Sequence, residues 1–91
     1  MENLKIIFHG RLDTISSPEL LSFYENSIKN RKEKFIILDC ADLEYVSSAG
    51  LRVFLIMYRS TGGNVKVINA NETVDEILDQ TGFKEFLMPE Q

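Results

Sequence analysis

The distribution of apolar residues along the chain predicts three main β-strands. Residues 4–9 are rich in β-branched and aromatic side chains and end at Gly10, and residues 11–14 continue them as a short strand or turn. Residues 35–38 form an unbroken apolar run of strand length, which is the pattern of a strand covered on both faces. Residues 64–68 form the third strand and follow a glycine turn.

Apolar residues at helical spacing predict a helix after the first strand and another after the second. The segment Ser16-Ser17-Pro18-Glu19 has a serine cap, a proline at the first helical position and an acid in the first turn. Apolar residues follow it at helical spacing at Leu21, Tyr24 and Ile28. Residues 42–47 are expected to form a loop, and the second helix covers residues 48–60 and ends at Thr61-Gly62-Gly63.

A third helix is predicted near the end of the chain. Asn71 caps it and Gly82 stops it, and its core face is Val74, Ile77 and Leu78. Residues 83–88 are apolar and are expected to pack as a last strand or turn. Strands that alternate with helices imply an α/β fold whose main strands run parallel. The 91 residues form one domain, residues 1–91.

The charge of the chain excludes one class of partner. A formal net charge of -4 argues against nucleic acid, because phosphate binding needs a basic patch or stripe. One basic cluster is present, and we interpret it as the solvated C-terminal end of a helix, where the helix dipole favours cations. Its members are Lys29, Arg31, Lys32 and Lys34.

Reactive side chains are scarce, which argues against an enzyme. Cys40 is the single cysteine and His9 the single histidine, so the sequence contains no disulfide framework, no metal-ligand cluster and no nucleophile–base pair. We therefore expect no catalytic residues, no metal and no cofactor. No signal peptide or apolar run of about 20 residues is present, which predicts a cytoplasmic protein that does not insert into a membrane.

Residues 42–55 contain the candidate functional segment. They run from the C-terminal end of a predicted strand, through a loop, onto the start of a helix, and ligands of open α/β sheets usually bind at that edge. Unpaired backbone N–H groups make a helix start receptive to an anion. From the residues alone, Ser47 and Ser48 either cap the helix or carry a phosphate.

Residues 45–51, Tyr-Val-Ser-Ser-Ala-Gly-Leu, resemble the signature of the STAS domain, the domain of bacterial anti-sigma factor antagonists. The resemblance extends, in the right order, to Gly10-Arg11-Leu12-Asp13 and to residues 35–39, 63–67 and 74–83. It implies a single small STAS-like α/β domain with a mixed, mostly parallel sheet of four to five strands and about three helices.

The resemblance also implies a mechanism. In that family the unmodified antagonist binds an anti-sigma factor, which is also a serine kinase, and so frees the sigma factor. The kinase phosphorylates a serine at the helix start, the complex weakens, and a metal-dependent serine phosphatase resets the switch. Aligned on Gly50, that serine is Ser48, with Ser47 as the second candidate.

Three departures from the family pattern bear on this mechanism. Ser47 stands where the best-known members have an acidic residue, and Ala49 where they have serine or threonine. The local charge is therefore less negative, which is expected to alter recognition by a kinase. Many members also continue into a final helix, whereas this chain stops soon after Met88, so the cover that such a helix gives is expected to be missing or shortened.

We predict a partner-binding surface around Ser48. On the second helix Val53, Ile56 and Met57 fall largely outside the core stripe; they either dock a partner or are covered by neighbouring helices. Arg52 lies one turn after Ser48 and either pairs with a phosphate or acidic partner group or remains a surface arginine. Asp13 either joins this surface or bonds its own turn. The predicted set is Asp13, Ser47, Ser48, Arg52, Val53, Ile56 and Met57.

A second function stays open at this point. The chain is either a phosphorylation-controlled antagonist with an anti-sigma factor/serine kinase and a serine phosphatase as partners, or a constitutive STAS subunit of a lipid transporter or other signalling assembly. In the second case the serine need not be modified.

Overall fold

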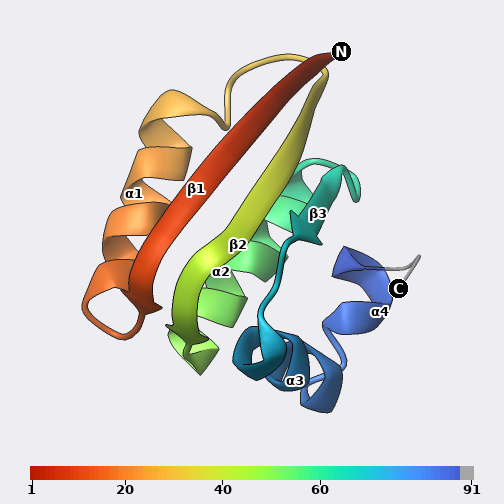
Figure 1. Ribbon diagram of the computed structural model, residues 1–91. Helices are drawn as coiled ribbons and strands as arrows, with labels where there is room; N and C mark the ends of the chain where they lie inside the picture. Colours follow the sequence, from red (N-terminus) through yellow and green to blue (C-terminus); the bar gives the residue numbers. More distant parts are fainter. Residues whose placement is uncertain (89–91) are drawn as a thin grey trace.

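The computed structural model describes residues 1–88, which fold as one three-stranded sheet with four helices (Figure 1). The strands are β1 (Glu2–Leu12), β2 (Lys34–Val46) and β3 (Val65–Ile68). The helices are α1 (Ser16–Ser27), α2 (Ser48–Ser60), α3 (Glu72–Gln80) and α4 (Lys84–Leu87). The sheet has the order β1-β2-β3, and both strand pairs are parallel.

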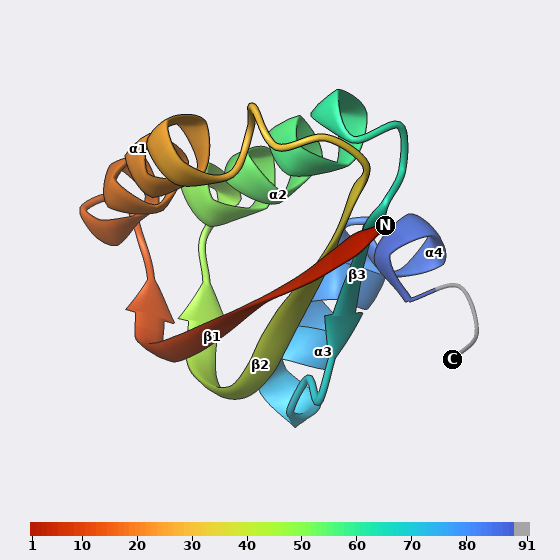
Figure 2. The same ribbon diagram turned by 90° about the horizontal axis from the view of Figure 1, so that it is seen from above.

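The helices lie on both sides of the sheet (Figure 2). Helices α1 and α2 pack side by side on one face, whereas α3 packs against β2 from the other and α4 lies against β3. Parallel strands joined by right-handed crossovers in the order β1-β2-β3 require α1 and α2 to share a face. Between these layers Phe8 of β1 packs its ring 5.8 Å from that of Phe54 of α2, and Tyr24 of α1 is fully buried.

The sheet is smaller than expected. The described residues contain three strands, and not the four to five that the family resemblance implied, and four helices in place of about three. The expected last strand or turn over residues 83–88 is the short helix α4. Phe83, Phe86 and Leu87 are spaced three and four residues apart, which is helical spacing, and Leu87 is fully buried.

Strand β2 is much longer than its apolar run, so the loop expected over residues 42–47 is wrong for all but its last residue. Pairing with β1 carries the strand through a polar stretch. Two bulges each add one residue to β2. At the first, an advance of two residues along β1 is matched by three residues along β2, and at the second, an advance of one residue is matched by two. The register passes from Ile7↔Asp39 to His9↔Asp42, and from Gly10↔Leu43 to Arg11↔Tyr45.

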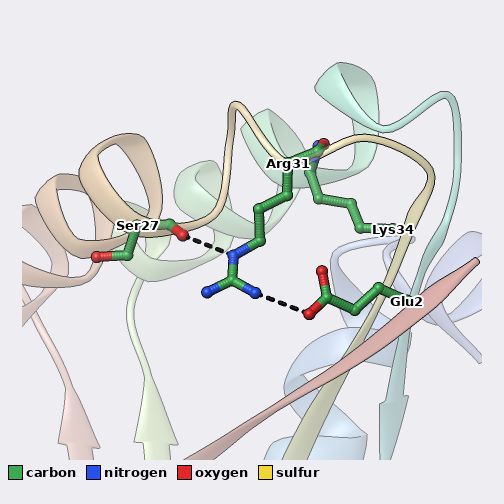
Figure 3. Close-up of polar contacts among 4 residues, drawn as sticks. All are labelled: Glu2, Ser27, Arg31 and Lys34. Carbon is green, nitrogen blue, oxygen red and sulfur yellow. Dashed lines mark hydrogen bonds and ion pairs between the residues drawn. The ribbon is translucent and has the colours of Figure 1, made fainter.

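The basic cluster ties the start of the sheet to the end of α1 (Figure 3). Arg31 places Nη1 2.7 Å from Oε2 of Glu2 and donates from Nε to the Ser27 carbonyl at 3.0 Å. Lys34 is only 8% exposed, and its Nζ donates to the carbonyls of Lys29 and Arg31 at 3.0 and 2.9 Å. The interpretation of this cluster as a solvated helix end is therefore wrong for Lys34, which holds the loop from inside.

The loop between β1 and α1 is held by Asp13. Its Oδ1 accepts hydrogen bonds from the backbone N–H of Ile15 at 2.9 Å and of Ser16 at 3.0 Å. The helix begins at Ser16, so Pro18 is not its first residue as expected. The free amides before the helix donate to Asp13 and not to a serine cap. The N–H groups of Ser16 and Ile15 hold the pKa of Asp13 below its ordinary value.

Helix α2 starts in close contact with the ends of both long strands. A Cβ built on Gly50 would lie 2.8 Å from Cδ2 of Leu12 and 2.8 Å from Cγ2 of Val46. Both neighbours are buried, and the β-branched valine has little rotamer freedom to move away. A residue without a side chain is therefore required where α2 crosses the strand ends.

Replacing Gly50 by alanine tests this close contact, because the contact and helix propensity predict changes of opposite sign in the free energy of unfolding. In a free helix Gly→Ala stabilises by about 0.5–1 kcal/mol. Here the overpacked methyl group is expected to reverse the sign and lower the free energy of unfolding by about 1–2 kcal/mol, measured by urea unfolding. Ser48→Ala, an exposed change two residues earlier in the same turn, is the matched control. A Gly50→Ala variant that is more stable than the wild type would contradict the close contact.

Replacing Asp13 by alanine is expected to destabilise the protein at neutral pH more than at acid pH. The lowered pKa means that the ionised carboxylate contributes stability above its unfolded pKa, about 3.9, and loses it as pH falls through the folded pKa. The unfolding free energies of wild type and Asp13→Ala should therefore converge below about pH 4. Glu44→Ala, at an exposed position of β2, controls for the loss of one negative charge. A constant difference from pH 7 to pH 3 would contradict the assigned role.

Candidate functional site

Ser47 is the N-cap of α2 and is committed to the fold. Its backbone is extended, with φ -84° and ψ 173°, and its Oγ accepts a hydrogen bond from the Gly50 N–H at 3.3 Å. Its carbonyl accepts from the Leu51 N–H at 2.9 Å, and its own N–H donates to the Leu12 carbonyl at 2.8 Å. The residue is 9% exposed. Ser47 therefore joins the end of β1, the end of β2 and the start of α2.

Ser48 is the first residue of α2 and differs from Ser47 in its exposure and in the bonding of its hydroxyl. It is exposed, and its hydroxyl makes no hydrogen bond with any residue from 1 to 88. The preceding cap has already used the Gly50 and Leu51 amides, so the structure leaves Ser48 without a capping task. The geometry thus separates a structural serine from an accessible one.

The Asp13 loop lies beside the start of α2. The hydrogen bond from Ser47 N–H to Leu12 O places the residue before Asp13 against the residue before Ser48. The two segments meet because β1 and β2 are parallel and end together, and in Figure 1 both lie at the lower ends of these strands. Asp13 is half-buried, with its carboxylate turned to its own loop, so its role is to shape this surface.

Two arginines supply positive charge near this end of the sheet. Arg52 is exposed one turn after Ser48 and forms no ion pair with any other described residue. Arg11 lies opposite Tyr45 in the register and places its guanidinium carbon 4.5 Å from the centre of that ring. Sequence reasoning missed the Arg11–Tyr45 pair, because the two bulges that bring these residues together leave no signal in the sequence.

Part of the predicted docking surface on α2 is buried in the domain itself. Val53 is 3% exposed and Met57 is fully buried, so their assignment to a docking surface is corrected: they are core residues. The cause is that α2 packs against α1 as well as the sheet, and a hydrogen bond between the hydroxyls of Tyr24 and Ser60 joins the two helices. Ile56 is partly buried and keeps some exposed surface.

The chemistry of the remaining reactive groups is limited. Cys40 is buried, and burial raises the pKa of its thiol to about 12, so it is not a thiolate nucleophile. His9 and Asp42 lie 3.5 Å apart on exposed strand positions. Within residues 1–88, no three His, Cys, Asp or Glu side chains are grouped to hold a metal ion.

A groove of about 700 Å³ lies away from Ser48, between β3 and α4. Its lining includes Phe35, Tyr58, Val67, Phe86 and Met88, and none of the predicted site residues. No helix among the described residues has both the length and the apolar character needed to cross a membrane.

Comparisons with known proteins agree with this geometry. The family model for the STAS domain matches residues 2–90. An anti-sigma F factor antagonist from Paenibacillus polymyxa is 30% identical over 76 residues, which is 80% of this chain and 65% of the relative, so the chain spans about two thirds of that protein's length. The solved structure of the anti-sigma factor antagonist SpoIIAA in its unphosphorylated form superposes with a TM-score of 0.80. That match has 21% identity and covers 96% of this chain and 78% of the other.

The solved structure shares the fold of this chain, whose described residues form a three-stranded sheet. The family model spans nearly the whole chain, including the α2 start and the Asp13 loop. The chain belongs to the STAS domain family.

Proposed function

We propose that this protein is an anti-sigma factor antagonist that binds an anti-sigma factor/serine kinase when Ser48 is unmodified and is released when Ser48 is phosphorylated. The observation that carries the proposal is the exposed hydroxyl of Ser48 directly after the buried cap Ser47. A kinase can reach Ser48 without unfolding α2, whereas modification of Ser47 would break the helix cap. The relative from Paenibacillus polymyxa supports the general role.

The start of α2 can accept a phosphate on Ser48 without losing its fold. Among residues 1–88, no hydrogen bond uses the backbone N–H of Ser48 or Ala49, and the positive end of the helix dipole lies at the same place. Arg52, four residues later on the helix, adds a cation within reach of a group on Ser48. We therefore expect phosphorylation to change the surface and leave the domain folded.

A docked partner responds differently from the domain. Phosphorylation adds about -1.5 to -2 charges and three strong acceptor oxygens. A partner surface packed over Ser48, Ile56 and the Asp13 loop would have to bury that charge, and burying a charge without a paired group is costly. The complex therefore weakens, although the antagonist itself is stable in both forms.

We infer that the protein is a binding module of the cytoplasm, with a serine kinase that modifies it and a serine phosphatase that resets it. It does not act as an enzyme, because Ser48 has no hydrogen-bonded base among the described residues and serves as a substrate. A constitutive STAS subunit of a lipid transporter or other assembly is the alternative that the experiment below separates from the switch.

Capture of partners by tagged variants tests the switch. Wild type, Ser48→Ala and Ser48→Asp are purified from the native host, and bound proteins are identified by mass spectrometry. Ser48→Ala should retain a serine kinase or anti-sigma factor at least as well as wild type. Ser48→Asp should lose most of it, even though aspartate carries less charge than phosphoserine. Ser22→Asp, the same change at an exposed position of α1, is the matched control and should retain the partner.

Equal capture of the same partners by all variants would contradict the switch and favour the constitutive assembly. Circular dichroism of each variant distinguishes a lost partner from a lost fold.

A further inference from the structure

Strand β1 presents a long edge that no other strand of the described residues pairs, although near its end the Ser16 hydroxyl donates to the Arg11 carbonyl at 2.9 Å. It is the outermost strand of the sheet beside α1, and its one neighbour in the sheet is β2 (Figure 1). Both bulges add their extra residue to β2, and within β1 the backbone departs from an extended conformation at Gly10, whose φ is 75°. β1 contains no proline. Alternate residues of such a strand point their N–H and C=O groups away from the sheet, where a further strand can pair with them.

Exposed apolar side chains gather beside this edge. The large hydrophobic residues that are most exposed in the described chain all belong to β1, to the residues flanking it or to α1. Ile7 is 57% exposed and Phe23 is 49% exposed, and together with Phe8 and Leu20 they line a groove of about 300 Å³ along β1 and α1. The complete set is Met1, Ile7, Ile15 and Phe23.

The same edge strand carries a row of basic residues. Lys5, His9 and Arg11 are exposed and lie at alternate positions with Ile7, so they share the face of β1 away from α1 and α2. Asp42 of β2 lies 3.5 Å from His9, and Tyr45 of β2 stacks on Arg11. This basic row stands out because the chain as a whole has a net charge of -4.

We propose that the free edge of β1 binds an extended segment of a partner protein in which acidic and apolar residues alternate, as an added strand of the sheet. Backbone hydrogen bonds to the edge give affinity, and alternate side chains give specificity. The apolar side chains of the segment lie over the groove lined by Phe8 and Phe23, and its acidic side chains lie on the face of Lys5 and Arg11. This surface is separate from Ser48, so the inference does not rest on the proposed switch.

The charge row selects against a second copy of the chain. Antiparallel pairing of two β1 strands about Phe8 places Lys5 opposite Arg11, and both of these side chains are positively charged. Like charges directly opposite each other destabilise a strand pair. Charged residues on an edge strand are a common protection against self-pairing, and here the same charges favour an acidic strand.

Titration of the ¹⁵N-labelled protein with two synthetic peptides tests this inference. The acidic peptide is a nine-residue Val-Glu repeat, and the basic peptide is the matching Val-Lys repeat. The acidic peptide should shift the amide resonances of β1 and Phe23, whereas the basic peptide should not. Lys5→Glu should weaken binding of the acidic peptide about two- to tenfold, because an attractive cross-strand pair becomes repulsive.

Two control variants show whether a loss of peptide binding is specific to β1. Lys66→Glu makes the same charge change on β3, at the opposite edge of the sheet, and should leave the peptide affinity unchanged. Ser48→Asp should also leave it unchanged, which separates failure of this inference from failure of the switch. Equal binding of both peptides, no shifts along β1, or a concentration-dependent dimer that protects the β1 amides would each overturn the proposal.

Discussion

The parallel pairing of β1 with β2 is the constraint on which the rest of the structure depends. It ends in one hydrogen bond, from the Ser47 N–H to the Leu12 carbonyl at 2.8 Å. Two bulges in β2 compensate for its extra residues and let strands of 11 and 13 residues end side by side. Without them the Asp13 loop and the start of α2 would not meet, because each additional residue moves a strand end by about 3.3 Å.

The contacts at the start of α2 depend on this junction of the two strand ends. Gly50 must lack a side chain because α2 crosses directly over Leu12 and Val46. The Ser47 hydroxyl accepts a hydrogen bond from the Gly50 N–H, and a cap of this kind typically contributes about 1 kcal/mol to stability. Ser48 is left exposed at the end of the helix where a phosphate is electrostatically favoured. The proposed division between a structural serine and a modifiable serine is thus a consequence of packing.

Sequence reasoning succeeded where the signal is local. The bounds of α2 and the cap of α3 by Asn71 agree with prediction, because serine and asparagine caps and glycine stops act within a few residues. The length of β2 was missed, since its polar half is a strand only through its pairing with β1. Val53 and Met57 were misplaced because α2 packs against both α1 and the sheet, and no pattern within α2 reveals which of its sides those elements cover. The Ser48 position came from the family resemblance, and the packing that distinguishes it from Ser47 came from the structure.

The central claim is that Ser48 receives the phosphate while Ser47 holds the helix. Site-resolved mass spectrometry of wild type, Ser47→Ala and Ser48→Ala purified from the native host, under conditions that preserve phosphoserine, tests it most directly. Phosphate is expected on Ser48 in wild type and in Ser47→Ala, and at neither position in Ser48→Ala. Phosphate on Ser47, or no phosphate on wild type while its kinase is present, would contradict the claim.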